Sequence, residues 1–143
     1  KTIVHTTSAG TQGIANADNA EEILTGSFVN ASAIAKYIKQ KNPSFVCLVC
    51  MGKAALSPTE EDTYCAEYIK SLLLEQYYPL TEKLHSLRYL EGKRFFNPNN
   101  QKQCPKRDFL LATTPNQFSF VLKATAHQRG YHKIEKIDVS YKN

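Results

Sequence analysis

Short apolar runs alternate with amphipathic helical patterns through the first eighty residues. The runs at 2–7, 22–25 and 45–51 predict strands, and the third is continuously apolar, as in a strand buried on both faces. Apolar residues at helical spacing predict one helix that begins near Asn30 and a longer one over 59–77. This alternation predicts an α/β fold, with a mostly parallel sheet in a three-layer α/β/α arrangement.

The second half of the chain has a different pattern. Amphipathic spacing predicts a helix over 81–90, and Pro105 is suited to open a short helix across 108–111. Apolar positions alternate weakly at 118–122, and those at 132–139 predict a terminal strand. We therefore expect the 143 residues to form a single α/β domain, whose second half is more helical and irregular and covers one edge or face of the sheet.

Composition and charge narrow the class of protein. Of the 143 residues, 42% are hydrophobic and 22% are charged, which is ordinary for a folded domain. No apolar run approaches the roughly 20 residues that span a bilayer, so we expect no membrane partner. The net charge of +5 comes from dispersed basic residues. A solvated basic face is therefore favoured and no nucleic-acid partner is expected, although a basic nucleic-acid-binding domain stays the weakest alternative.

Two of the four cysteines form a C-x-x-C sequence, which is typical of zinc or redox sites. Cys47 and Cys50 lie inside the apolar run, and side chains three apart on a strand point to opposite faces. Core packing is therefore favoured over metal binding or redox chemistry. Free buried thiols are compatible with a reducing compartment, so we expect the protein in the cytoplasm.

Three turns rich in glycine, hydroxyl and acidic residues follow the expected strands, at 6–13, 26–30 and 51–62. In an open parallel sheet such turns gather at the carboxyl ends of the strands. Glycine amides and helix starts at that edge favour an anion. The sequence therefore predicts a site for a small anionic substrate.

The first two turns offer uncharged donors to that anion. Ser8, Gly10 and Thr11 supply hydroxyl and main-chain groups in the first turn, which an ordinary tight turn explains equally well. Ser27 and Asn30 flank the site in the second turn if the two turns are neighbours. Capping of the following helix explains Asn30 without any ligand.

The third turn opens the long helix with three acids. Thr59 and Asp62 have the spacing of a capping box, and the helix dipole stabilises acids in this position. Asp62 also shares the apolar stripe of the helix, which places its carboxylate at the inner edge. Acids beside an anion site repel the substrate unless a cation intervenes. A phosphate bridged to these acids by Mg²⁺ is therefore favoured over capping alone.

Taken together, these segments resemble the 2-phosphosulfolactate phosphatase family. The resemblance runs from about residue 4 to residue 122, in order and spacing. It is carried by residues 5–14, 26–31 and 48–52, by Glu61-Asp62 with Cys65-Ala66, and by Cys104-Pro105 with Asp108-Phe109. It implies an α/β hydrolase of coenzyme M biosynthesis, which removes the phosphate of a sulfonated hydroxy acid with Mg²⁺.

Carried over by position, the resemblance implies roles for the candidate residues. Ser8, Gly10 and Thr11 line the anion site, Ser27 and Asn30 flank it, and Glu61 and Asp62 bind the metal or orient water. Family members have an additional N-terminal half. The resemblance therefore implies that this chain is the C-terminal portion of a longer two-part enzyme, inactive alone if the missing half completes the site.

Three questions stay open at this level. The chain is either the catalytic portion of that phosphatase or a non-catalytic anion-binding domain that keeps the turns without the chemistry. A homo-oligomer is also left open, and the sequence assigns no nucleophile.

Overall fold

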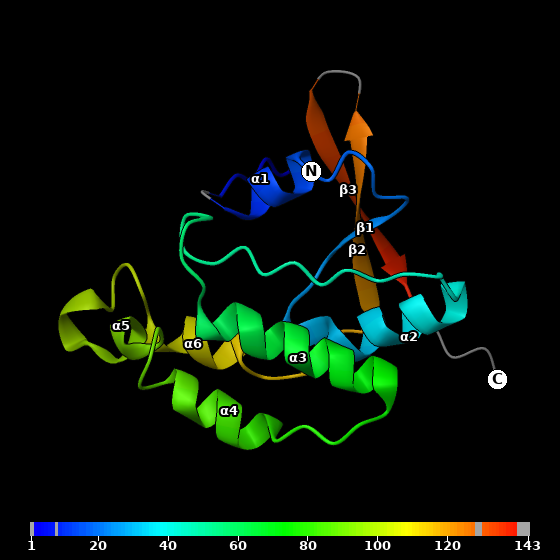
Figure 1. Cartoon of the computed structure of the whole chain (residues 1–143). Helices are drawn as coiled ribbons and strands as arrows, with labels where there is room; N and C mark the ends of the chain where they lie inside the picture. The colour runs from blue at the N-terminus through cyan, green and yellow to red at the C-terminus, as the bar shows by residue number, and fades with distance from the viewer. Residues whose placement is uncertain (1, 8, 128–129, 140–143) are drawn as a thin grey trace.

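The computed structural model describes residues 2–7, 9–127 and 130–139. Its sheet has three strands in the order β1-β2-β3: β1 (Ile23–Thr25), β2 (Phe120–His127) and β3 (Tyr131–Asp138). Both pairings are antiparallel, with Ile23 opposite Ala124 and Phe120 opposite Asp138. The strands stand above a layer of helices, and α1 lies beside them (Figure 1).

Helices make up most of the regular structure in the described residues. They are α1 (Gly10–Ala15), η1 (Phe28–Asn30), α2 (Ala31–Lys41), α3 (Glu60–Leu74), α4 (Leu80–Leu87), α5 (Lys93–Phe96), η2 (Pro98–Asn100) and α6 (Lys106–Ala112). The helices predicted from Asn30, over 59–77 and over 81–90 are confirmed as α2, α3 and α4. The short helix after Pro105 is confirmed as α6.

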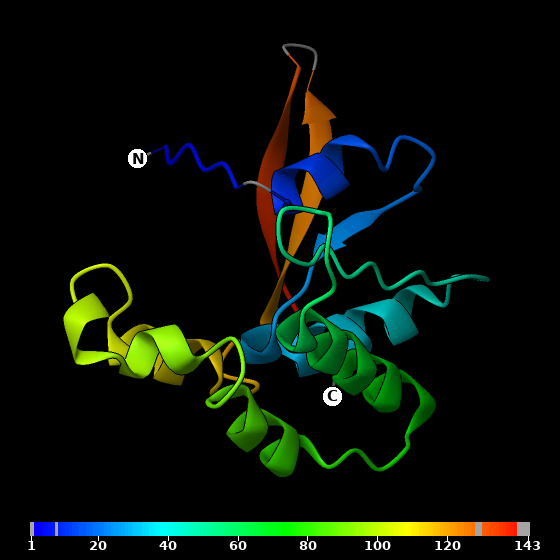
Figure 2. The same ribbon diagram turned by 60° about the vertical axis from the view of Figure 1, so that its left-hand side comes forward.

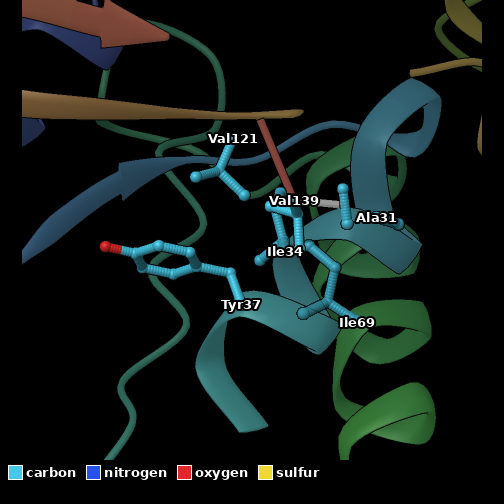
Figure 3. Packing of buried hydrophobic residues seen from close by; sticks show 7 residues of the cluster. Ala31, Ile34, Tyr37, Ile69, Val121 and Val139 are labelled. Atoms are coloured by element: carbon cyan, nitrogen blue, oxygen red, sulfur yellow. The ribbon is translucent and has the colours of Figure 1, made fainter. Parts of the chain in front are cut away.

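The core forms where α2 and α3 pack against one end of the sheet. Ala31 and Val121 are fully buried, and Ile34 and Ile69 are 3% and 4% exposed. Figure 3 shows these side chains converging from α2, α3 and β2, with Val139 after the end of β3. The apolar stripe that predicted α2 from the sequence is therefore the surface that it buries.

Asn116, in the loop between α6 and β2, forms hydrogen bonds to the helices that surround this core. Its side-chain oxygen accepts a hydrogen bond from the Ser32 amide at 2.9 Å, and so caps the start of α2. Its side-chain amide donates to the Tyr68 hydroxyl of α3 at 2.7 Å, and its backbone amide donates to the Phe28 carbonyl at 3.0 Å. The second half of the chain thus holds α2 and α3 in place.

The predicted fold class is wrong. The structure has a small antiparallel sheet of three strands with six α-helices, and the described residues contain no parallel sheet between two helical layers. The short strand at 22–25 is confirmed as β1 and the terminal strand at 132–139 as β3, and the weakly alternating region 118–122 overlaps the start of β2. Strand β1 pairs with β2 across about a hundred residues, which local patterning does not reveal.

The other two predicted strands, at 2–7 and 45–51, are absent from the structure. Neither stretch has a strand partner among the described residues. Phe45 is 80% exposed and Cys47 and Cys50 are exposed, so the prediction that these thiols pack in a core is also wrong. An apolar run indicates that burial is favourable, but it does not specify what covers it. Figure 2 shows the run as an extended trace between α2 and the loop into α3.

Within the described part of the chain, no helix combines the length and apolar character that crossing a membrane requires.

Candidate functional site

The three acids Glu60, Glu61 and Asp62 form the first turn of α3, as the sequence predicts. Asp62 accepts a hydrogen bond from the Gly52 amide at 2.6 Å, which fixes its carboxylate against the preceding loop. The capping box expected between Thr59 and Asp62 is not formed, and the buried Thr59 hydroxyl has no partner in the described structure. The partner of Asp62 is thus a main-chain amide of another segment.

The loop before α3 has an unusual backbone. Gly52 has φ +64°, and Ala54 and Ala55 have φ of 55° and 58°, in the left-handed region that non-glycine residues avoid. The Lys53 amide donates to the Ser57 carbonyl at 2.8 Å and closes the loop. The Gly52 amide that binds Asp62 is therefore positioned by a tight and strained turn.

Glu61 faces a different environment from Asp62. It lines a hollow of about 190 Å³ between the start of α3 and the α5–α6 region. Aromatic rings and charged groups share the lining, among them Phe28, Phe95, Phe109, Glu91 and Arg94. Burial and the negative charge of Glu91 raise the pKa of Glu61, against the opposing charge of Arg94.

Glu91 joins this acid cluster from the loop after α4. It accepts a hydrogen bond from the Glu60 amide at 3.1 Å, and its second oxygen is buried without a partner in the described structure. The neighbouring side chain of Glu91 raises the pKa of Glu60. Burial opposes the ionisation of Glu91, but its interactions with Glu60, including the hydrogen bond from the Glu60 amide, keep the pKa of Glu91 below its usual value. The cluster therefore concentrates negative charge at the start of α3.

Glu61→Gln is expected to stabilise the protein at neutral and higher pH. Because its folded pKa is raised, the stability associated with Glu61 is fully present below its unfolded pKa and is lost as pH rises through the folded value. Glu61 is partly solvated, so we expect a gain of only a few tenths of a kcal/mol to about 1 kcal/mol at pH 8, and none at pH 4. Thermal melts at both pH values measure this difference. A lower melting temperature for the variant at pH 8 would contradict it.

Gly10 and Thr11 lie in the first turn of α1. The Thr11 hydroxyl donates to the Thr7 carbonyl at 2.7 Å, and the Thr11 amide donates to the Thr7 hydroxyl at 3.2 Å. A Cβ atom at Gly13 would overlap the side chain of Met51, so α1 lies directly against the residue that precedes Gly52. Ser8 lies outside the described residues.

Ser27 and Asn30 bond to each other. The Asn30 side-chain oxygen accepts from the Ser27 amide at 3.2 Å and from its hydroxyl at 2.9 Å. The Asn30 side-chain amide donates to the Phe120 carbonyl of β2 at 3.4 Å, and Asn30 is 3% exposed. In this structure the pair fixes η1 to the sheet, and the start of α2 is capped by Asn116 instead.

Only some of the candidate residues come together. The segment Met51–Gly52 contacts α1 at Gly13 and α3 at Asp62, so the first and third turns are joined through it. Ser27 and Asn30 are joined to β2. Sequence reasoning missed two groups of this site. Glu91 belongs to no motif. The Gly52 amide could have been suspected, because a glycine follows directly after an apolar run.

Cys65 does not serve as a ready nucleophile beside these acids. Burial and the charge of Asp62 raise the pKa of its thiol to about 12. The thiol is therefore protonated at neutral pH, which is compatible with its packing against the core.

Comparison with known proteins assigns the family. The sequence profile described as 2-phosphosulpholactate phosphatase matches residues 1–103. The chain belongs to this family. A relative in Caldicellulosiruptor saccharolyticus, named "Probable 2-phosphosulfolactate phosphatase", is 37% identical over 81 residues, which cover 54% of this chain and 33% of the relative. A second, with the same name, in Caldanaerobacter subterraneus subsp. tengcongensis is 42% identical over 52 residues, which cover 36% of this chain and 21% of the relative. No solved structure matches the chain.

The family match locates the candidate site within the shared region. The 2-phosphosulpholactate phosphatase profile ends at residue 103, so it includes the acids of α3 and Glu91 and excludes α6, β2 and β3. The resemblance to this family that the sequence analysis places at residues 4–122 therefore extends beyond the region that the profile matches. The chain spans about a third or less of the length of these curated relatives.

The acids fit a magnesium ion only as contributors to a site. Within the described residues, no three His, Cys, Asp or Glu side chains converge as a metal site. Mg²⁺ commonly takes one or two protein carboxylates and completes its shell with water and substrate phosphate. Asp62 has one oxygen bound to the Gly52 amide, which orients the carboxylate and leaves the other oxygen for such a ligand.

Proposed function

We propose that this chain is part of a magnesium-dependent phosphatase, which hydrolyses the phosphate monoester of 2-phosphosulfolactate or a similar small phosphorylated acid. Family membership over residues 1–103 is the observation that carries the proposal. The position of Asp62 supports it, because a strained turn in the matched part of the chain holds this acid through the Gly52 amide, and the preceding Met51 contacts α1.

The proposed roles follow the surroundings of each acid. Asp62 would provide a carboxylate ligand for a magnesium ion, which would supply neutralisation of the phosphate charge and activation of water. Glu61, with its raised pKa, holds or accepts a proton at the neighbouring hollow. Gly10 and Thr11 contribute amide and hydroxyl groups from the α1 side. Thr11 would first have to release Thr7.

We further propose that additional polypeptide completes this site, as in a protein of the relatives' full length. Two acids and one short helix start do not enclose a substrate. The unmatched two thirds or more of each relative is the available source of further groups. Four free cysteines support a reducing cytoplasm as the location.

Phosphate release from 2-phosphosulfolactate tests the function, with and without Mg²⁺. The assay compares this chain with a joined protein, in which the chain replaces the matched stretch of the Caldicellulosiruptor saccharolyticus relative. We expect magnesium-dependent release by the joined protein and little by the chain alone. Release by the unaltered relative but not by the folded joined protein would contradict the proposal. Substrate binding without release would identify the anion-binding alternative.

A further inference from the structure

The residues 45–50, termed here the extended segment, are exposed except at Leu48. Leu48 packs against the core cluster. Phe45 and Val49 are 80% and 68% exposed, and Cys47 between them is exposed as well. Alternate residues of an extended chain share a side, so these three side chains form an apolar stripe directed away from the core.

The backbone of the extended segment is also without partners. None of its amides or carbonyls makes a hydrogen bond within the described part of the chain. Unpaired backbone next to exposed apolar side chains is the combination that accepts an added strand, because main-chain hydrogen bonds and side-chain burial form together. A surface loop of this length ordinarily carries polar residues instead.

The extended segment leads directly into the candidate site. It is followed by Met51 and Gly52, which contact α1 and hold the Asp62 carboxylate. Polypeptide paired along the segment therefore reaches the acidic start of α3. In Figure 2 the segment runs into the loop that precedes α3.

We propose that the extended segment is a strand-addition surface, and that its occupant is polypeptide corresponding to the part of the curated relatives that this chain does not match. This proposal rests on the proposed function, since it names the surface through which the site is completed. The occupant is argued from length, because 67% or more of each relative lies outside the match. A second copy is a poorer occupant, since each copy carries a net charge of +5.

Hydrogen exchange of the backbone amides tests the pairing directly. In the chain alone, amides 45–50 are expected to exchange as fast as in an unstructured peptide, while those of α2 are protected. In the joined protein we expect amides 45–50 to slow by on the order of 100-fold. Fast exchange at 45–50 beside a protected α2 in the joined protein would overturn the proposal. Protection that rises with the concentration of the chain alone would overturn it in favour of a second copy.

If the joined protein does not fold, the same pairing is tested by co-expressing its two parts as separate polypeptides. This chain and the unmatched part of the Caldicellulosiruptor saccharolyticus relative are expected to copurify, with amides 45–50 protected. Recovery of the folded chain alone, with those amides unprotected, would overturn the proposal.

Paired lysine variants show whether the segment itself is the contact. Val49→Lys is expected to reduce copurification at least about tenfold, because lysine on an edge strand opposes pairing. Leu111→Lys is the matched control, since Leu111 is 57% exposed on α6, outside the segment. Equal copurification of the two variants would overturn the proposal.

The outcomes separate the docking surface from the function. A joined protein with protected amides 45–50 and no phosphate release supports the surface and contradicts the phosphatase. A joined protein that releases phosphate while those amides exchange freely supports the phosphatase and overturns the surface.

Discussion

Gly52→Ala is expected to destabilise the protein by about 2 kcal/mol, because two costs act at one position. Gly52 has φ +64°, where an L-residue is disfavoured by about 1–2 kcal/mol. A Cβ atom at Gly52 would also overlap the Ser57 carbonyl oxygen, which is main chain and cannot swing aside like the end of a side chain. The loop must open to relieve the overlap. Because this movement relaxes the contact, it limits the total loss of stability.

Thermal denaturation measures this change, with Gly130→Ala as its matched control. Gly130 also has positive φ, at +77°, but among the described residues no atom beyond its chain neighbours lies within 4 Å of the Cβ position. Gly130→Ala therefore reports backbone strain without overlap. A loss of about 2 kcal/mol corresponds to roughly 4–8 °C in a domain of this size. Equal melting temperatures for the two variants would show that the contact with Ser57 costs nothing.

Opening of this loop has a second expected consequence. The amide that binds Asp62 belongs to Gly52 itself. In the joined protein, Gly52→Ala is therefore expected to reduce phosphate release more than Gly130→Ala does, even at a temperature where both variants are folded.

The longer helices were predictable from the sequence because their periodicity reports a local property. Ala31, Ile34 and Ala35 recur at helical spacing and are buried at 0%, 3% and 4% exposure in α2. In α3, Ile69 lies on the stripe that the spacing identifies and is 4% exposed. A helix satisfies its backbone within itself, so its pattern specifies both the element and its buried face.

The sheet was not predictable for the opposite reason. Strand β2 pairs with β1, about a hundred residues earlier, and its polar positions such as Lys123 leave only a weak alternation at its start. The apolar run at 45–51 has a strong strand pattern but no partner among the described residues. Strand formation depends on what lies beside a segment, and sequence patterns do not contain that information.

The sequence predicts which residue types form the candidate site better than it predicts which of them are in contact. The acids of α3 were recognised from their place on the helix, and the structure places them at its start. The amide partner of Asp62 and the approach of Glu91 depend on how distant loops fold. Asn30 was assigned to a ligand or a helix cap, whereas its side chain binds Ser27 and β2.

Asp62→Asn is expected to remove activity while leaving the fold nearly unchanged. Asparagine keeps a side-chain oxygen that accepts from the Gly52 amide, so only the charge is lost. The hydrogen bond to a neutral acceptor is weaker, and so is the interaction with the helix dipole. Together these losses lower the free energy of unfolding by about 1 kcal/mol. If the carboxylate binds the metal or orients water, turnover by the joined protein falls on the order of 100-fold or more.

Asp62→Ala provides the comparison that separates anchoring from chemistry. Alanine removes the acceptor as well as the charge, and leaves the Gly52 amide without its partner, at a cost of about 1–3 kcal/mol. Phosphate release and thermal stability are measured for both variants in the joined protein. The proposed role predicts equally low turnover but a clearly higher melting temperature for Asp62→Asn. Turnover of Asp62→Asn within about threefold of the unmodified protein would instead assign Asp62 to anchoring the loop alone.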